Sequence, residues 1–136
     1  MMETEEKYKV VIVDDERTAI DALRRELEPY REFEVKGIAG NGAKGKKMIM
    51  ELHPDLLFLD VEMPGMTGIE MADALRKIDP WVCISFVTSY DAFAIQAFRL
   101  DALDYVMKPI KYTQVKHIIE KAKLQIDYRK NAQKAE

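Results

Sequence analysis

The sequence has 136 residues, of which 48% are hydrophobic and 33% are charged, and its formal net charge at pH 7 is -3. This length and composition predict one globular domain with room for a substantial core. The small negative charge argues against a protein that holds nucleic acid or anionic lipid by general electrostatic attraction.

The chain begins with six acidic or neutral residues, where a secretory signal peptide would be basic and then apolar. No apolar run approaches the roughly 18 residues that a membrane-spanning helix requires. The single cysteine, Cys83, cannot form an intrachain disulfide, and its apolar surroundings predict a buried, inert thiol. These features predict a cytoplasmic protein with no membrane association.

Short apolar segments alternate with segments of helical periodicity. The predicted strands are Tyr8–Val13, Phe33–Ile38, Leu56–Asp60, Val82–Val87 and Leu103–Met107. Three of them are apolar without alternation, which is typical of parallel strands covered on both faces. Phe33–Ile38 alternates more and suits the edge of a sheet.

Predicted helices fill the intervals between the strands. The first has Ile20, Leu23 and Leu27 on one face and stops before Pro29. The other helices are predicted at Gly42–Leu52, at Ile69–Ile78 with Thr67 as its cap, at Asp91–Leu100, and along Val115, Ile118, Ile119, Ala122 and Ile126.

This order, a strand followed by a helix five times, predicts an α/β fold with a parallel sheet and helices on both faces. Right-handed crossovers place the carboxyl ends of all the strands at one edge, where ligands bind in such sheets. The polar residues expected at that edge are Asp14, Asp15, Asp60, Thr88 and Lys108.

The aspartates at this edge indicate phosphoryl chemistry. Asp14 and Asp15 follow the first strand, and Asp60 ends the third. Three crowded carboxylates repel one another unless a divalent cation joins them, and Mg2+ prefers oxygen ligands of this kind. A carboxylate beside Mg2+ can attack phosphorus and form an aspartyl phosphate.

Each of these residues also has an ordinary structural interpretation. Asp15 and Glu16 suit the start of a helix, where acidic side chains are favourable. Asp60 suits an Asx-turn in the loop that follows it. Thr88 is ordinary at a strand end, and Lys108 is ordinary at a surface. The phosphoryl interpretation therefore depends on the residues occurring together.

Taken together, the motifs resemble the receiver domain of bacterial two-component response regulators. They are Val13-Asp14-Asp15-Glu16, the run from Asp60 through Met63-Pro64-Gly65 to Gly68, Thr88-Ser89 and Tyr105-Val106-Met107-Lys108-Pro109. The runs around Phe86–Asp91 and Ala102–Tyr105 are most similar to the LytTR-type subgroup.

The resemblance implies the flavodoxin-like receiver fold, with strand order 2-1-3-4-5. It places the receiver domain at residues 1–126. Residues 127–136 are then a polar tail, which we expect to fray, or the start of a linker to an output domain that this sequence lacks.

The resemblance also implies how the site works. Asp60 would be the phosphoacceptor, taking a phosphoryl group from a sensor histidine kinase or from a small donor such as acetyl phosphate. Mg2+ or Mn2+ would be held by Asp14, Asp15, Asp60 and the backbone carbonyl of Glu62. The domain would catalyse only its own phosphorylation and dephosphorylation.

The remaining motif residues would bind the phosphoryl group or respond to it. Thr88 and Lys108 would contact its oxygens, with a cis Lys108-Pro109 bond aiming the lysine inward. Tyr105 would turn inward as the switch, while Glu62 and Tyr90 would tune dephosphorylation.

The surface expected to change on phosphorylation is formed by the fourth helix, the fifth strand and the fifth helix. Phe93 and Phe98 lie on the predicted fourth helix. This surface is the predicted site of homodimerisation. The implied output is transcription, with DNA contacted only through the missing LytTR domain.

Other functions remain open at this point. One alternative is a stand-alone receiver in a phosphorelay, and another is a receiver that has lost phosphorylation. A phosphatase of the haloacid dehalogenase type needs two aspartates separated by one residue, whereas Asp14 and Asp15 are adjacent. A flavodoxin-like cofactor binder needs a phosphate-cradling loop after the first strand, where this chain is acidic.

Overall fold

The computed structural model describes residues 7–134. The acidic segment from which we predict the absence of a signal peptide, residues 1–6, lies outside the described residues, as do residues 135–136 of the predicted tail. Within residues 7–134, no helix combines the length and the apolar character that crossing a membrane requires.

Strands and helices alternate along the described chain. The strands are β1 (Tyr8–Val13), β2 (Phe33–Ala39), β3 (Leu56–Leu59), β4 (Cys83–Thr88) and β5 (Asp104–Met107). The helices are α1 (Arg17–Leu27), α2 (Gly42–Leu52), α3 (Gly68–Ile78), α4 (Ala94–Arg99) and α5 (Tyr112–Lys134).

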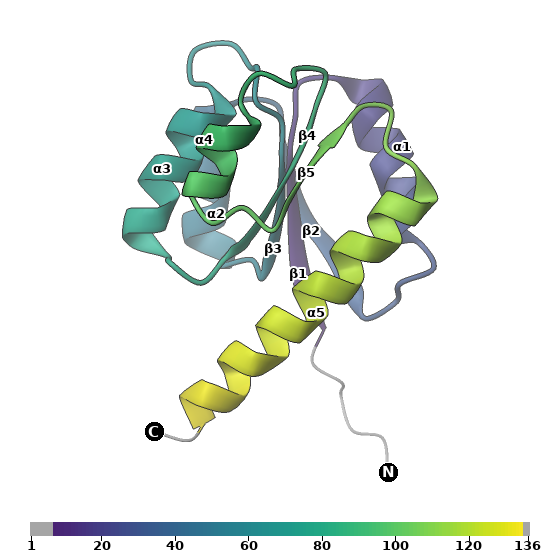
Figure 1. The fold of residues 1–136 in the computed structure, drawn as a ribbon, viewed down its shortest axis with the longest axis vertical. Coiled ribbons are helices and arrows are strands. Elements are labelled where there is room, and N and C mark those ends of the chain that lie inside the picture. Colours follow the sequence, from purple (N-terminus) through teal and green to yellow (C-terminus); the bar gives the residue numbers. More distant parts are fainter. Residues whose placement is uncertain (1–6, 135–136) are drawn as a thin grey trace.

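The five strands form one parallel sheet in the order β2-β1-β3-β4-β5, which confirms the predicted topology. Helices α1 and α5 cover one face of the sheet, and α2, α3 and α4 cover the other (Figure 1). The strand order reverses between β1 and β3, so a crevice for ligands is expected at the carboxyl ends of these two strands.

The sheet separates two apolar layers because the side chains of a strand alternate between its faces. In β1, Val10 and Ile12 pack with α1 and α5, while Val11 and Val13 pack with the opposite helices. This burial on both faces explains the unbroken apolar runs of the central strands. The alternating strand β2 lies at an edge, as predicted.

Helices α3 and α4 differ in length from the sequence prediction. Helix α3 begins at Gly68, after a capping box in which Thr67 and Glu70 bond each other's backbone N–H groups. Helix α4 has only six residues, Ala94–Arg99, in place of the predicted ten. No side chain caps its amino end, so the residues before Ala94 lack that stabilisation.

Helix α5 corrects the expectation that the chain frays from Asp127, because it continues to Lys134. The guanidinium of Arg129 lies 2.6 Å from the carboxylate of Asp55, and the Tyr8 hydroxyl donates to Asp127 at 2.5 Å. These partners at the amino edge of the sheet hold the helix in place. The domain boundary at residue 126 stays a prediction.

The thiol of Cys83 is buried, as predicted. Burial raises its pKa to about 11. A protonated thiol is a poor nucleophile, so the structure favours a packing role for this residue.

Candidate functional site

The carboxyl ends of four strands place polar side chains at one edge. Asp14 follows β1, Asp60 follows β3, Thr88 ends β4 and Lys108 follows β5. Backbone hydrogen bonds continue past the strand ends, from the N–H of Asp60 to the carbonyl of Val13 at 3.0 Å and from the N–H of Lys108 to the carbonyl of Thr88 at 2.8 Å. The edge is therefore an ordered extension of the sheet.

Asp14, Asp15 and Asp60 form an acidic cluster at this edge. One carboxylate oxygen of each lies within 4.8 Å of those of the other two, Asp14 and Asp60 are buried, and Asp15 is exposed. Converging hard oxygen donors of this kind fit a divalent cation such as Mg2+. The sequence prediction that these three aspartates meet is confirmed.

Lys108 is the counter-charge of the cluster. Its ammonium lies 2.9 Å from Asp14, 3.0 Å from Glu16 and 3.2 Å from Asp60. Burial disfavours the charged lysine, but hydrogen bonds to Asp14 and Glu16 and the charges of Asp14 and Asp60 outweigh it and raise the pKa of Lys108. The ammonium is thus held charged among carboxylates.

At this edge the single ammonium of Lys108 faces four carboxylates, those of Asp14, Asp15, Glu16 and Asp60. Burial, with help from the charge of Asp60, raises the pKa of Asp14 to about 6, although the Glu16 N–H and Lys108 act in the opposite direction. The site therefore carries excess negative charge in a poorly hydrated place, which a cation would relieve.

Thr88 and Tyr105 lie on neighbouring strands beside the cluster. Thr88 is fully buried, and its hydroxyl oxygen accepts a hydrogen bond from the N–H of Tyr90 at 3.3 Å. The Tyr105 hydroxyl donates to the carbonyl of Tyr90, and its ring centroid lies 5.8 Å from that of Phe86. The loop after β4 is therefore tied to both predicted switch residues.

The other predicted site residues are placed as follows. The Lys108-Pro109 peptide bond is cis, as predicted. Glu62 and Tyr90 are both exposed, and the charge of Glu62 raises the pKa of Tyr90, so the two side chains are close enough to interact. The role of the Glu62 carbonyl as a metal ligand stays a prediction, as do the roles of both side chains in dephosphorylation.

Two residues have contacts at this site that the sequence did not indicate. Glu16 binds Lys108, although the two residues are 92 positions apart and Glu16 has the sequence context of a helix cap. Gly68 packs directly on the Asp60 backbone: a Cβ there would lie 2.1 Å from the Asp60 carbonyl oxygen. Gly68 is thus required by the close approach of the Asp60 backbone.

We expect Gly68→Ala to lower the free energy of unfolding by about 1–3 kcal/mol, because the added methyl group forces the Asp60 backbone to move. Urea unfolding monitored by circular dichroism measures this change. Gly40→Ala is the matched control, since its Cβ would meet nothing closer than the Asp14 carbonyl oxygen at 4.0 Å. Equal stability of the two variants would show that the loop relaxes freely around the methyl group.

Residues 10–120 match the family model described as the response regulator receiver domain. The chain belongs to this family. Receiver domains are signalling modules, and the acidic cluster of this one occupies the edge at which the family generally binds Mg2+.

Curated relatives of this receiver domain are longer regulators. It is 38% identical over 117 residues to the sensory transduction protein LytT of Bacillus cereus. This match covers 86% of this chain and 48% of LytT. It is 41% identical over 103 residues to the transcriptional regulatory protein BtsR of Escherichia coli, covering 75% of this chain and 42% of BtsR. The chain thus spans about half the length of these relatives, and the LytT similarity agrees with the LytTR-type resemblance.

Among solved structures, the receiver domain of AraT, a response regulator from Geobacillus stearothermophilus, superposes with a TM-score of 0.83 at 28% identity. The match covers 90% of this chain and 98% of the AraT domain. Fold and family are therefore supported independently by sequence and by structure.

Proposed function

We propose that this receiver domain accepts a phosphoryl group on Asp60 from a sensor histidine kinase, and that the modification switches its output. The observation that carries the proposal is the position of the Asp60 carboxylate. It is buried at the carboxyl edge of the sheet, beside two other aspartates and 3.2 Å from the ammonium of Lys108.

The aspartates and the Glu62 carbonyl would hold Mg2+ or Mn2+, which supplies positive charge that offsets repulsion between the carboxylates and the incoming phosphoryl group. A carboxylate oxygen of Asp60 attacks phosphorus as the bond from phosphorus to the donor nitrogen breaks, and the electron pair leaves with the histidine of the kinase. Lys108 and Thr88 donate to phosphoryl oxygens.

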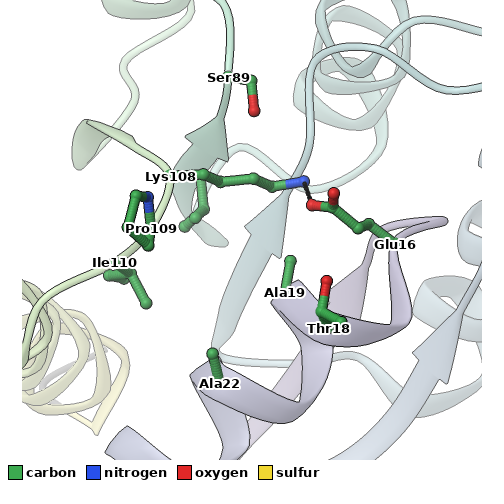
Figure 2. Close-up of a pocket in the computed structure, with 9 residues that line it drawn as sticks. Glu16, Thr18, Ala19, Ala22, Ser89, Lys108, Pro109 and Ile110 are labelled. Atoms are coloured by element: carbon green, nitrogen blue, oxygen red, sulfur yellow. Dashed lines mark hydrogen bonds and ion pairs between the residues drawn. The ribbon is translucent and has the colours of Figure 1, made fainter.

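A cavity beside Lys108, whose ammonium lies 3.2 Å from Asp60, supports approach by a protein donor. It has a volume of about 350 Å³ and lies between α1 and the segment after β5 (Figure 2). Ala22, Pro109 and Ile110 supply apolar lining, while the Lys108 side chain reaches across to Glu16 at one side. An apolar hollow that adjoins Lys108 suits a side chain of the kinase beside its phosphohistidine.

Phosphorylation replaces one carboxylate charge with a group of about -1.5 to -2, and it adds oxygens that attract the Thr88 hydroxyl. The Tyr90 N–H now bonds that hydroxyl oxygen, and the Tyr90 carbonyl holds Tyr105. Movement of Thr88 would therefore disturb the loop and release Tyr105 to turn inward. These contacts support a two-state switch biased by a local charge.

The face formed by α4, β5 and α5 carries exposed apolar side chains, which supports homodimerisation there. They are Ile95, Phe98, Met107 and Tyr112.

Beryllofluoride mimics the phosphoryl group on an aspartate. When it is added with Mg2+, sedimentation velocity should show the protein change from monomer to dimer, and Phe98→Asp should prevent the change. Monomers under both conditions at high concentration would contradict dimerisation.

Regulation of transcription is the proposed output. The relatives about twice as long as this chain include BtsR, described as a transcriptional regulator, and LytT. DNA would be contacted only through an additional domain of the LytTR type. A stand-alone receiver in a phosphorelay is the second candidate, because the phosphoryl chemistry needs only residues present in this chain. Onward transfer of the phosphoryl group from Asp60 to a histidine of a second protein would favour the relay.

The test of the proposed function is a Mg2+-dependent gain of one phosphoryl group from acetyl phosphate, lost in Asp60→Asn.

A further inference from the structure

Lys108 has a full set of partners before any phosphoryl group is present. An ammonium has three N–H donors. Three carboxylates, those of Asp14, Glu16 and Asp60, lie 2.9–3.2 Å from the nitrogen. To serve a phosphoryl group, Lys108 must therefore redirect at least one donor.

The three partners differ in what their release would cost. The side chains of Asp14 and Asp60 are 7% exposed, whereas that of Glu16 is 53% exposed. A buried carboxylate that loses its cation is left without solvation, but an exposed one is hydrated by water. Glu16 is thus the partner that Lys108 can leave at least cost.

Glu16 is also fixed in position. It is the residue immediately before α1, and its N–H donates to the Asp14 carboxylate at 2.9 Å. This bond fixes the backbone from which the Glu16 side chain reaches Lys108. Figure 2 shows the Lys108 side chain extended toward Glu16, and both residues line the cavity. Glu16 lies outside the three-aspartate cluster, although its N–H bonds Asp14 and its partner Lys108 also binds Asp14 and Asp60.

We propose that Glu16 is a positioning residue that competes with the phosphoryl group for the ammonium of Lys108, and so opposes charging of the domain. The inference rests on the proposed function, because it concerns phosphorylation of Asp60. Before phosphorylation Glu16 holds Lys108, and the phosphoryl oxygens must draw the ammonium away from it. Neutralising Glu16 removes this competition and shifts the balance toward the phosphorylated arrangement.

The test is the affinity of the Mg2+-loaded protein for beryllofluoride, measured by isothermal titration calorimetry. We expect Glu16→Gln to bind about fivefold more tightly than the unmodified protein, the change expected for loss of one exposed ion pair. The substitution is nearly isosteric at an exposed position, so the midpoint of urea unfolding should stay unchanged. Equal or weaker binding by Glu16→Gln would overturn the proposal.

Two variants separate the contact with Lys108 from the charge of Glu16 alone. Glu16→Asp keeps the charge but shortens the reach, so it should also bind beryllofluoride more tightly. In a Lys108→Met background, the effect of Glu16→Gln should vanish. The same fivefold gain without Lys108 would mean that general charge repulsion acts instead, and would refute a positioning role.

The outcomes also distinguish this inference from the proposed function. If the unmodified protein binds beryllofluoride and Glu16→Gln binds no better, the receiver chemistry stands and the competition by Glu16 does not. If the unmodified protein neither binds beryllofluoride nor gains a phosphoryl group from acetyl phosphate, both fail together.

Discussion

Asp60→Asn is expected to abolish phosphorylation. After incubation with acetyl phosphate and Mg2+, intact-mass analysis should show one added phosphoryl group on the unmodified protein and none on the variant. The physical reason is that the amide of asparagine has no carboxylate oxygen to attack phosphorus, and one ligand charge for the metal is lost as well. The effect should be complete, because Asp60 is the proposed nucleophile itself.

The matched control is Asp73→Asn, which makes the same chemical change at an exposed position on α3. This variant should gain the phosphoryl group as the unmodified protein does. Chelation of Mg2+ by EDTA should prevent the gain in both.

Acid lability identifies the modified group. An aspartyl phosphate is lost in acid, whereas an ester on Ser89 or Thr88 would survive. Equal labelling of the unmodified protein and Asp60→Asn would contradict the assignment of the acceptor. If neither protein is labelled, the binding of beryllofluoride to the unmodified protein is measured next. Binding would mean that small donors cannot phosphorylate a competent site, and no binding would mean that the site lacks the chemistry.

The sequence predicted which polar residues meet at the carboxyl edge of the sheet, because the pattern that places each of them there is local. Each of Asp14, Asp60 and Lys108 follows a short apolar segment, and parallel strands deliver their carboxyl ends to one edge. The parallel arrangement therefore predicted that Asp14 and Lys108, 94 positions apart, share one edge, and the structure places them within hydrogen-bonding distance.

The contacts that sequence reasoning missed depend on side-chain reach rather than on strand order. Glu16 has the sequence context of a helix cap, but its side chain makes no capping bond and binds Lys108 instead. The length of α4 was overestimated, because apolar spacing does not reveal an amino end without a capping side chain.

Side-chain reach also explains why the predicted fraying of the C-terminal segment from Asp127 is wrong. Its polar composition indicated a fraying tail, yet Arg129 reaches Asp55, 74 positions away in sequence. An arginine in a charged helix looks solvated until its partner across the fold is known. Polar residues whose partners lie on other elements are thus the part of this fold that pattern alone does not supply.

Asp55 joins three elements at the amino edge of the sheet. Its carboxylate accepts the N–H of Lys9 at 2.8 Å and binds the Arg129 guanidinium at 2.6 Å, and its carbonyl accepts the N–H of Cys83 at 3.0 Å. The Asp55 and Arg129 side chains are only 9% and 11% exposed. This ion pair therefore links α5 to the start of the sheet in a poorly hydrated place.

We expect Arg129→Met to lower the free energy of unfolding by about 3–5 kcal/mol, because removing one partner leaves the Asp55 charge buried without compensation. Urea unfolding measures the loss. Hydrogen exchange should show faster exchange in α5 beyond Ile126, since that part of the helix loses its ion pair to the sheet. Arg99→Met, the same substitution at an exposed position, should change stability by less than about 0.5 kcal/mol.

The double variant Asp55→Asn with Arg129→Met identifies the cause of the loss. An asparagine retains an oxygen for the Lys9 N–H but carries no charge, so it should recover part of the stability that Arg129→Met removes. Recovery would mean that the penalty comes from the unpaired carboxylate. If the double variant is as unstable as the sum of the two single variants, the stabilisation lies in the packing of the arginine side chain and the charges are not coupled.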